Sequence, residues 1–98
     1  MSRAVVVRYR VKPDALEQNL QLVRAVYDEL AATRPEGLRY STYRVDETTF
    51  VHVALIDGTD NPLTEVSAFQ AFTSGINDRC EEPPQAVSGE LVGSYQPV

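Results

Sequence analysis

A single histidine stands inside an otherwise apolar stretch, T-T-F-V-H-V-A-L-I-D, at residues 48–57. The stretch is typical of a buried β-strand, and His52 occupies a position where an aliphatic side chain is expected. Imidazole ordinarily titrates between pH 5 and 8, so chemistry near neutral pH depends on His52 or on groups with perturbed pKa values. Two interpretations stay open: a core histidine bonded to Ser41 or a backbone carbonyl, and a functional group.

The neighbours of His52 depend on how the preceding strand pairs with its own. A two-residue turn at 46–47 places Ser41 opposite His52 and Tyr43 opposite Phe50. A hydroxyl beside the imidazole would fix its tautomer or orient a substrate oxygen. Tyr43 opposite Phe50 is more typical of a cross-strand aromatic pair than of a catalytic acid. With the diagonal position included, the residues expected to share this face are His52, Ser41, Tyr43 and Arg39.

Six segments with regular hydrophobic patterns divide the chain. Pro13 is placed to start the first helix, R-P-E-G at 34–37 to end it, and Thr64 to cap the second helix. Cys80 falls late in that second helix, and E-E-P-P-Q then ends it. The expected elements are a strand at 4–11, a helix at 14–33, strands at 38–45 and 48–56, a helix at 64–80 and a strand at 86–95.

This order of elements predicts the α+β class and a ferredoxin-like fold, in which a βαββαβ chain forms one four-stranded antiparallel sheet. Right-handed crossovers place strands one and three in the centre of the sheet and both helices on one face. A chain of 98 residues is too short to bury two independent cores, so we expect a single domain, 1–98.

The third strand is apolar on both of its sides, although the helices can cover only one face of the sheet. An uncovered aliphatic face tends to bury itself, and a second copy of the same chain is the commonest cover for a self-complementary patch. We therefore expect a homodimer packed through the sheet face, which is a dimeric α/β barrel. The two sides of the strand carry Phe50, Ala54 and Ile56, and Val51, Val53 and Leu55.

The composition argues against several classes of partner. One cysteine, Cys80, and one histidine cannot supply a disulfide or a four-ligand zinc site within one chain. A formal net charge of -5 opposes binding to nucleic acid or to an anionic membrane surface. Phosphate-binding glycine motifs are absent, so no nucleotide cofactor is expected. Without an apolar run of about 18 residues or an export leader, the cytoplasm is the expected location.

Nearly the whole chain resembles the antibiotic biosynthesis monooxygenase-like domains of the dimeric α/β barrel superfamily. The resemblance lies in the V-V-V-R-Y-R-V-K-P-D entry into the first helix, R-P-E-G-L-R-Y before the second strand, and the F-V-H-V-A-L-I-D strand. The aromatic second helix and the P-P that precedes a strand ending in G-S-Y also match.

The resemblance implies a cavity between the sheet and the helices that holds an aromatic or quinone-like molecule. Some members of the family oxygenate such a molecule without metal or flavin, so no cofactor is implied. His52 falls on a cavity-lining position of the third strand, and imidazole suits the role of general base near pH 7. Phe69 and Phe72 of the second helix would supply an apolar lid, although they are first of all core residues.

Three functions remain compatible with these features. The first is a cofactor-independent monooxygenase that deprotonates a phenol or enol and lets the anion reduce oxygen. The second is a non-catalytic dimeric ligand-binding or assembly module, and the third is an isomerase or cyclase of the same fold. Haem degradation is disfavoured, because the chain has no tryptophan and its sole histidine lies on a strand rather than a helix.

Overall fold

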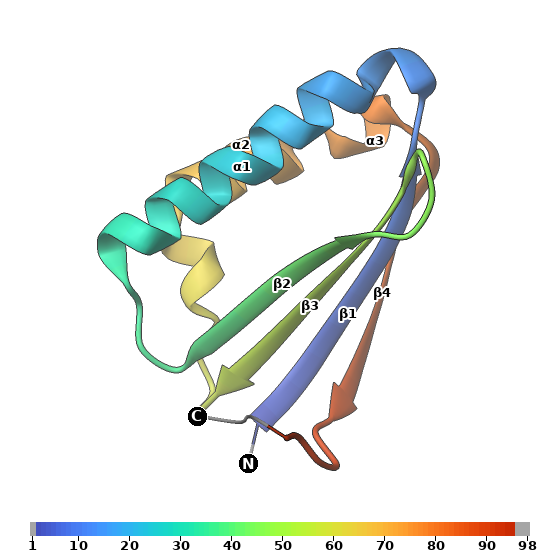
Figure 1. The fold of residues 1–98 in the computed structure, drawn as a ribbon. Coiled ribbons are helices and arrows are strands. Elements are labelled where there is room, and N and C mark those ends of the chain that lie inside the picture. The colour runs from blue at the N-terminus through green and yellow to red at the C-terminus, as the bar shows by residue number, and fades with distance from the viewer. Residues whose placement is uncertain (1, 96–98) are drawn as a thin grey trace.

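The structure is a computed structural model that describes residues 2–95. A four-stranded antiparallel sheet carries all of the helices on one face, as Figure 1 shows. The strand order is β2-β3-β1-β4, which confirms the ferredoxin-like prediction with strands one and three in the centre. The strands are β1 (Ser2–Val11), β2 (Leu38–Arg44), β3 (Thr49–Asp57) and β4 (Cys80–Glu90). The helices are α1 (Leu16–Thr33), α2 (Ser67–Ser74) and α3 (Ile76–Arg79), with 3-10 turns η1 (Pro13–Ala15) and η2 (Pro62–Glu65).

Helix α1 lies along the sheet and buries one side against it (Figure 1). The 3-10 turn that holds Pro13 leads into the helix, as the fixed φ of proline favours. The buried side carries apolar residues, Val23 and Val26 among them, but it also carries the fully buried amide of Asn19. The helix ends at Thr33, and the next residue, Arg34, has φ 48° and donates its N–H to the carbonyl of Leu30.

The β2–β3 hairpin pairs one residue out of step with the prediction. Thr42, not Ser41, lies opposite His52. The strands are joined by residues 45–48, because the carboxylate of Asp46 accepts hydrogen bonds from the backbone N–H groups of Thr48 (3.0 Å) and Thr49 (2.8 Å). The predicted two-residue turn was therefore wrong, and a shift by one residue moves every side chain of β2 to the other face of the sheet.

The second helical region is divided where one helix was predicted. The side chain of Asn61, rather than Thr64, caps a 3-10 turn by accepting from the N–H of Leu63 at 3.0 Å. Helix α2 then begins at Ser67, and Gly75 separates it from α3 because glycine favours helix poorly.

Helix α2 has no capping side chain of its own at its N-terminus. The carboxylate of Glu29, which comes from α1, accepts from the backbone N–H groups of Ser67 (3.0 Å) and Ala68 (2.9 Å) and from the Ser67 hydroxyl (2.8 Å). A negative charge at this end is favourable because the first N–H groups of a helix lack backbone partners. This contact ties the two helices together.

Strand β4 begins six residues earlier than the predicted strand at 86–95, at Cys80. Cys80 is thus the first residue of the strand and not a late helical residue, and it is buried. The two prolines at 83–84 are tolerated because β4 is an edge strand, where an N–H is not needed on the free side. The prediction that the strand reaches Tyr95 was wrong, because β4 ends at Glu90.

The two faces of the sheet differ in cover, as predicted. Phe50, Ala54 and Ile56 of β3 are buried beneath the helices. On the opposite face, the rows Ser41–Val53–Val6–Val87 and Arg39–Leu55–Ala4–Gly89 cross all four strands, and no helix of the described residues covers them. Within residues 2–95, no helix is both long and apolar enough to span a membrane.

Candidate functional site

A cavity of about 260 Å³ lies between the helix-facing side of the sheet and helices α2 and α3. Its wall is mostly apolar and includes Val5, Val7, Ala54, Leu63, Phe69 and Phe72. Four polar side chains also reach it, namely Tyr40, His52, Asn61 and Thr73. Apolar walls with a few convergent polar groups are typical of sites for small organic molecules, and the volume suits a small one.

His52 is held at this wall by hydrogen bonds to both of its ring nitrogens. Its side chain is 4% exposed. The Nε2 atom lies 2.8 Å from the hydroxyl oxygen of Tyr9, and Nδ1 lies 2.5 Å from that of Tyr40. A third hydroxyl, that of Thr42, lies 3.1 Å from Nδ1. The imidazole is therefore fixed in position by the two strands that flank β3, since Tyr9 comes from β1, and Tyr40 and Thr42 come from β2.

Burial determines the charge of these groups. Desolvation lowers the pKa of His52 from 6.5 to about 4, so the imidazole is neutral at pH 7. Desolvation likewise raises the pKa values of Tyr9 and Tyr40 well above the ordinary value for a phenol. The site thus presents neutral hydroxyl groups and a neutral imidazole to a ligand.

A second layer of polar groups lies behind Tyr9. Its hydroxyl oxygen accepts from Nδ2 of Asn19 at 3.0 Å, and Oδ1 of Asn19 accepts from Nε of Arg79 at 3.4 Å. Arg79 is 6% exposed, donates to the backbone carbonyl of Phe72 at 2.6 Å, and places its guanidinium carbon 5.4 Å from the centre of the Phe72 ring. No carboxylate of the described chain lies within ion-pair distance of this buried cation.

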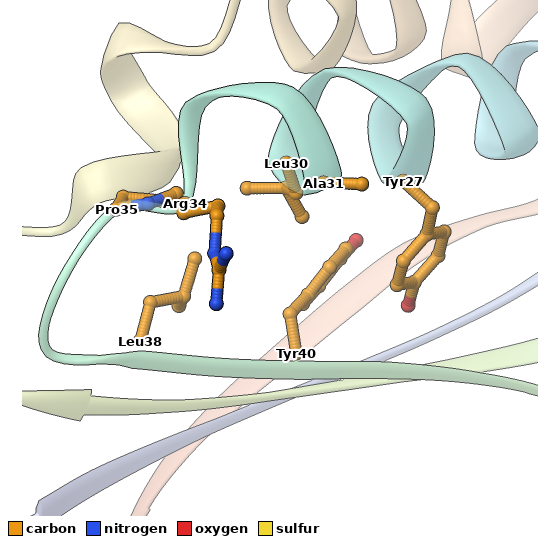
Figure 2. A pocket seen from close by; sticks show the side chains of 7 residues that line it. All are labelled: Tyr27, Leu30, Ala31, Arg34, Pro35, Leu38 and Tyr40. Atoms are coloured by element: carbon orange, nitrogen blue, oxygen red, sulfur yellow. The ribbon is translucent and has the colours of Figure 1, made fainter.

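Tyr40 separates the cavity from a second hollow at the C-terminal end of α1. This hollow has a volume of about 570 Å³, and Figure 2 shows Arg34, Leu38 and Tyr40 lining one part of it. The ring of Tyr40 stacks on that of Tyr27 at 5.4 Å between centroids, and the Tyr27 hydroxyl lies 2.8 Å from Thr42 Oγ1. Tyr40 is therefore held by the stack of its ring on Tyr27 and by the contact of its hydroxyl with His52.

The residues predicted to line the site are only partly brought together. Phe69 and Phe72 line the cavity with His52, as expected from their place on the second helix. Ser41, Tyr43 and Arg39 do not share a face with His52, and this prediction was wrong. All three lie on the opposite, uncovered face of the sheet and are exposed, because the true register is shifted by one residue.

Five polar residues of the site were missed in the sequence: Tyr9, Asn19, Tyr40, Thr42 and Arg79. One signal was available for Asn19, since it lies among the apolar residues that α1 turns to the core, three positions after Leu16 and four before Val23. A polar residue on such a stripe must find a buried partner. Tyr40 and Thr42 depended on the register, which the turn residues did not reveal.

No protein-family model matches the chain, and no curated protein is similar to it in sequence. Solved structures do match in fold. A protein of unknown function from Nitrosomonas europaea superposes with a TM-score of 0.75 at 16% identity, covering 99% of this chain and 95% of that one.

Two further matches have descriptions that name an activity. A protein from Nitrosomonas europaea, described as a candidate antibiotic biosynthesis monooxygenase, matches with a TM-score of 0.75 and 19% identity over 93% of this chain and 90% of that one. A variant of SnoaB, a cofactor-independent oxygenase from Streptomyces nogalater, matches with a TM-score of 0.69 and 14% identity over 95% of each chain. The chain therefore has the ferredoxin-like fold of the antibiotic biosynthesis monooxygenase-like proteins.

Proposed function

We propose that this protein is a small-molecule enzyme of the cofactor-independent monooxygenase type, acting on an aromatic or quinone-like metabolite. One observation carries the proposal: Tyr40 and the neutral imidazole of His52 face a mostly apolar cavity from the same wall. Such a cavity excludes water, holds a flat apolar molecule and offers a hydrogen bond to one oxygen atom. The described activity of SnoaB, whose fold is similar, agrees with this function.

The reaction needs an acidic C–H or O–H on the substrate and molecular oxygen as the oxidant. Loss of the proton leaves an electron-rich anion, which the cavity stabilises and which then reduces oxygen. For an anthrone, the ring methylene carbon loses two hydrogen atoms and gains one atom of O₂. The second oxygen atom leaves as water with those two hydrogen atoms. The product is a quinone, and no electron has to come from the protein.

His52 is the candidate general base of this proposal, but its environment sets a limit. A pKa of about 4 makes the imidazole a weak base unless a negative charge forms beside it. A substrate anion in the cavity would be such a charge. The base role also requires a ring nitrogen with a lone pair that faces the substrate. Which nitrogen carries the hydrogen therefore decides whether His52 accepts a proton or only orients Tyr40.

A non-catalytic ligand-binding module is the second candidate function. It is favoured by a specific observation, because both ring nitrogens of His52 already have partners within the protein. A histidine that is fully bonded in the core needs no reaction to explain it. In this case the cavity would hold the same class of ligand without changing it.

We also propose that the protein is a homodimer joined through the uncovered sheet face. The row that contains Val53 and Val6 is aliphatic, and it runs on to Val87, which is 65% exposed. Tyr43, on the same face, is 57% exposed. Side chains of this kind on an uncovered face favour self-association, since a second copy presents the same surface.

Oxygen consumption with a panel of anthrones and hydroquinones tests the enzyme. We expect uptake of oxygen by the wild-type protein, quinone formation by mass spectrometry, and loss of both in His52→Ala and Tyr40→Phe. The variants are assayed below their own melting temperatures, so that unfolding does not mimic loss of chemistry. A saturable thermal shift with a panel member, without any product, would favour the binding module instead. Full turnover by His52→Ala would contradict any role of the imidazole in the reaction.

A further inference from the structure

We propose that Arg79, Asn19 and Tyr9 impose one direction on the hydrogen bonds at His52. As a result, Tyr40 turns its hydroxyl hydrogen to the cavity, and the site selects a ligand oxygen that accepts, such as a quinone carbonyl, an enolate or a phenolate. The inference concerns the cavity of the proposed function, but it needs no turnover to hold.

Arg79 sets the donor-to-acceptor direction of these hydrogen bonds, because a guanidinium group can only donate. Its Nε atom faces Asn19 at 3.4 Å and therefore requires the amide oxygen of Asn19 on that side. The amide nitrogen of Asn19 must then face the other way, towards Tyr9. The opposite orientation would bring two donors together in a site where Asn19 is 0% exposed.

The orientation of the Asn19 amide in turn fixes the hydroxyl of Tyr9. Its oxygen receives the hydrogen bond from Asn19 at 3.0 Å, and its other polar neighbour in the described chain is Nε2 of His52 at 2.8 Å. Tyr9 is 1% exposed, so its hydroxyl hydrogen cannot turn to water. The hydrogen must point at Nε2, which then holds a lone pair and no hydrogen. The reverse order would leave a buried O–H without an acceptor.

A neutral imidazole with an unprotonated Nε2 carries its hydrogen on Nδ1. That hydrogen is directed to the hydroxyl oxygen of Tyr40 at 2.5 Å, with Thr42 Oγ1 at 3.1 Å as a weaker acceptor. Within residues 2–95, the remaining acceptor beside the hydroxyl hydrogen of Tyr40 is Thr42 Oγ1. That oxygen is shared with the Tyr27 hydroxyl at 2.8 Å and with Nδ1 at 3.1 Å. Because Tyr40 lines the cavity, its hydroxyl hydrogen is available to a ligand. In this arrangement His52 orients Tyr40, and it acts as the base of the proposed reaction only if its hydrogen first moves from Nδ1 to Nε2.

The charge of Arg79 supports the same ligand class. It is a buried cation without a carboxylate partner in the described chain, and it lies behind Phe72, a wall of the cavity. A chain of donors that begins at a cation is polarised along its length, which strengthens the last donor. Tyr40 is that last donor. The cavity is thus suited to an oxygen on which negative charge lies or develops.

Replacing the amide nitrogen of Asn19 with an oxygen should reverse the direction of every hydrogen bond from Asn19 to Tyr40. In Asn19→Asp the carboxylate accepts from Arg79 and also from Tyr9, so the Tyr9 hydroxyl turns away from His52. The Nε2 atom must then carry the hydrogen and donate to Tyr9, and Nδ1 becomes the acceptor for Tyr40. Tyr40 loses its free hydrogen in this variant. The matched control is Asn61→Asp, which makes the same chemical change at the wall of the same cavity but outside the chain of donors.

Nitrogen-15 NMR can read the tautomer directly, because His52 is the only histidine. We expect the Nδ1–H tautomer in the histidine-labelled wild type and in Asn61→Asp, and the Nε2–H tautomer in Asn19→Asp. The wild-type spectrum is decisive even if Asn19→Asp does not fold. The Nε2–H tautomer in the wild type, or no change of tautomer in a folded Asn19→Asp, overturns the proposal.

Binding of 1-indanone and indane tests the ligand class, since these bicyclic molecules differ by one carbonyl oxygen. We expect 1-indanone to bind the wild type about tenfold more tightly or better, as one added hydrogen bond allows, with its carbonyl stretch moved to lower wavenumber. Tyr40→Phe and Asn19→Asp should bind both molecules alike. Equal binding by the wild type, or binding of neither molecule, overturns the ligand selection. A failure of oxygen consumption leaves these results untouched and counts only against the proposed enzyme.

Discussion

The hydroxyl oxygen of Tyr9 lies 2.8 Å from Nε2 of His52, and the two side chains are 1% and 4% exposed. Each group therefore depends on the other for its hydrogen bond. We predict that Tyr9→Phe lowers the free energy of unfolding by about 1–3 kcal/mol, because it leaves the His52 nitrogen and the amide of Asn19 buried without a partner. Urea unfolding measures the change. Tyr95→Phe, at an exposed tyrosine outside the sheet, is the control and should stay within ~0.5 kcal/mol of the wild type.

Tyr40→Phe separates the chemistry of the site from its packing. The ring keeps its stack on Tyr27, whereas the hydroxyl that meets the ligand is removed. We predict that oxygen consumption with a substrate of the wild type falls by roughly 10²–10³-fold, which is typical for the loss of one donor to a developing oxyanion. Michaelis kinetics should assign the loss to kcat more than to KM. Unchanged kinetics in Tyr40→Phe would contradict the placement of the substrate oxygen beside this residue.

The sequence predicted the fold because its signals are periodic and strong. The alternation of Phe50, Ala54 and Ile56 with the apolar residues between them identified a strand that is covered on one face and apolar on the other. The same period of two puts His52 on the face of Phe50, but the sequence left open whether that face meets the helices or a second subunit; the family resemblance favoured the cavity, where the structure places it. These inferences depend on repeating patterns, which survive an error of a residue or two at the ends of an element.

The partners of His52 could not be predicted in the same way, because they depend on registers between strands. Asp46 caps the N–H groups that follow it and lengthens the turn, which put Thr42 opposite His52 in place of Ser41. A turn of uncertain length leaves two registers, and these place opposite sets of side chains in the cavity. The contact of Tyr9 with Asn19 joins β1 to α1, and no local pattern encodes such a pair.

The pH dependence of stability tests the burial of His52. In the unfolded chain the imidazole of His52 binds a proton below about pH 6.5. In the folded protein, burial lowers the pKa of His52 to about 4. Between these values the unfolded state holds more protons, so stability must fall as the pH falls. The whole window corresponds to roughly 3 kcal/mol.

Urea unfolding between about pH 6.5 and pH 5 checks this prediction, because few carboxyl groups titrate there. The wild type should lose stability over this range. His52→Gln should show a nearly flat profile, since the titrating group has been removed. A wild-type profile as flat as that of His52→Gln would mean that the imidazole is accessible to water.

Glu29 should give a second, acidic transition in stability. Hydrogen bonds from the N–H of Ala68 and from Ser67 lower the pKa of its carboxyl group below the ordinary 4.5. The stabilisation is therefore present above that value and is lost as the pH falls through the lowered pKa of the folded state. We predict that Glu29→Gln has a lower melting temperature than the wild type at pH 7 and that the two converge in acid. Asp28→Asn, at an exposed carboxyl on the same helix, should show no such convergence.

We predict that the uncovered face of the sheet joins two copies of the chain. Val53 lies between Ser41 and Val6 in a row that crosses the sheet, and the helices cannot reach this side. We predict that the wild-type protein sediments as a dimer at micromolar concentration and that Val53→Glu sediments as a monomer, because a desolvated carboxylate would face its own copy across the interface. Thr64→Glu, at an exposed position among the helical turns, is the control and should stay dimeric. A stable wild-type monomer would show that these aliphatic side chains remain in contact with water and would remove the need for a second subunit at this face.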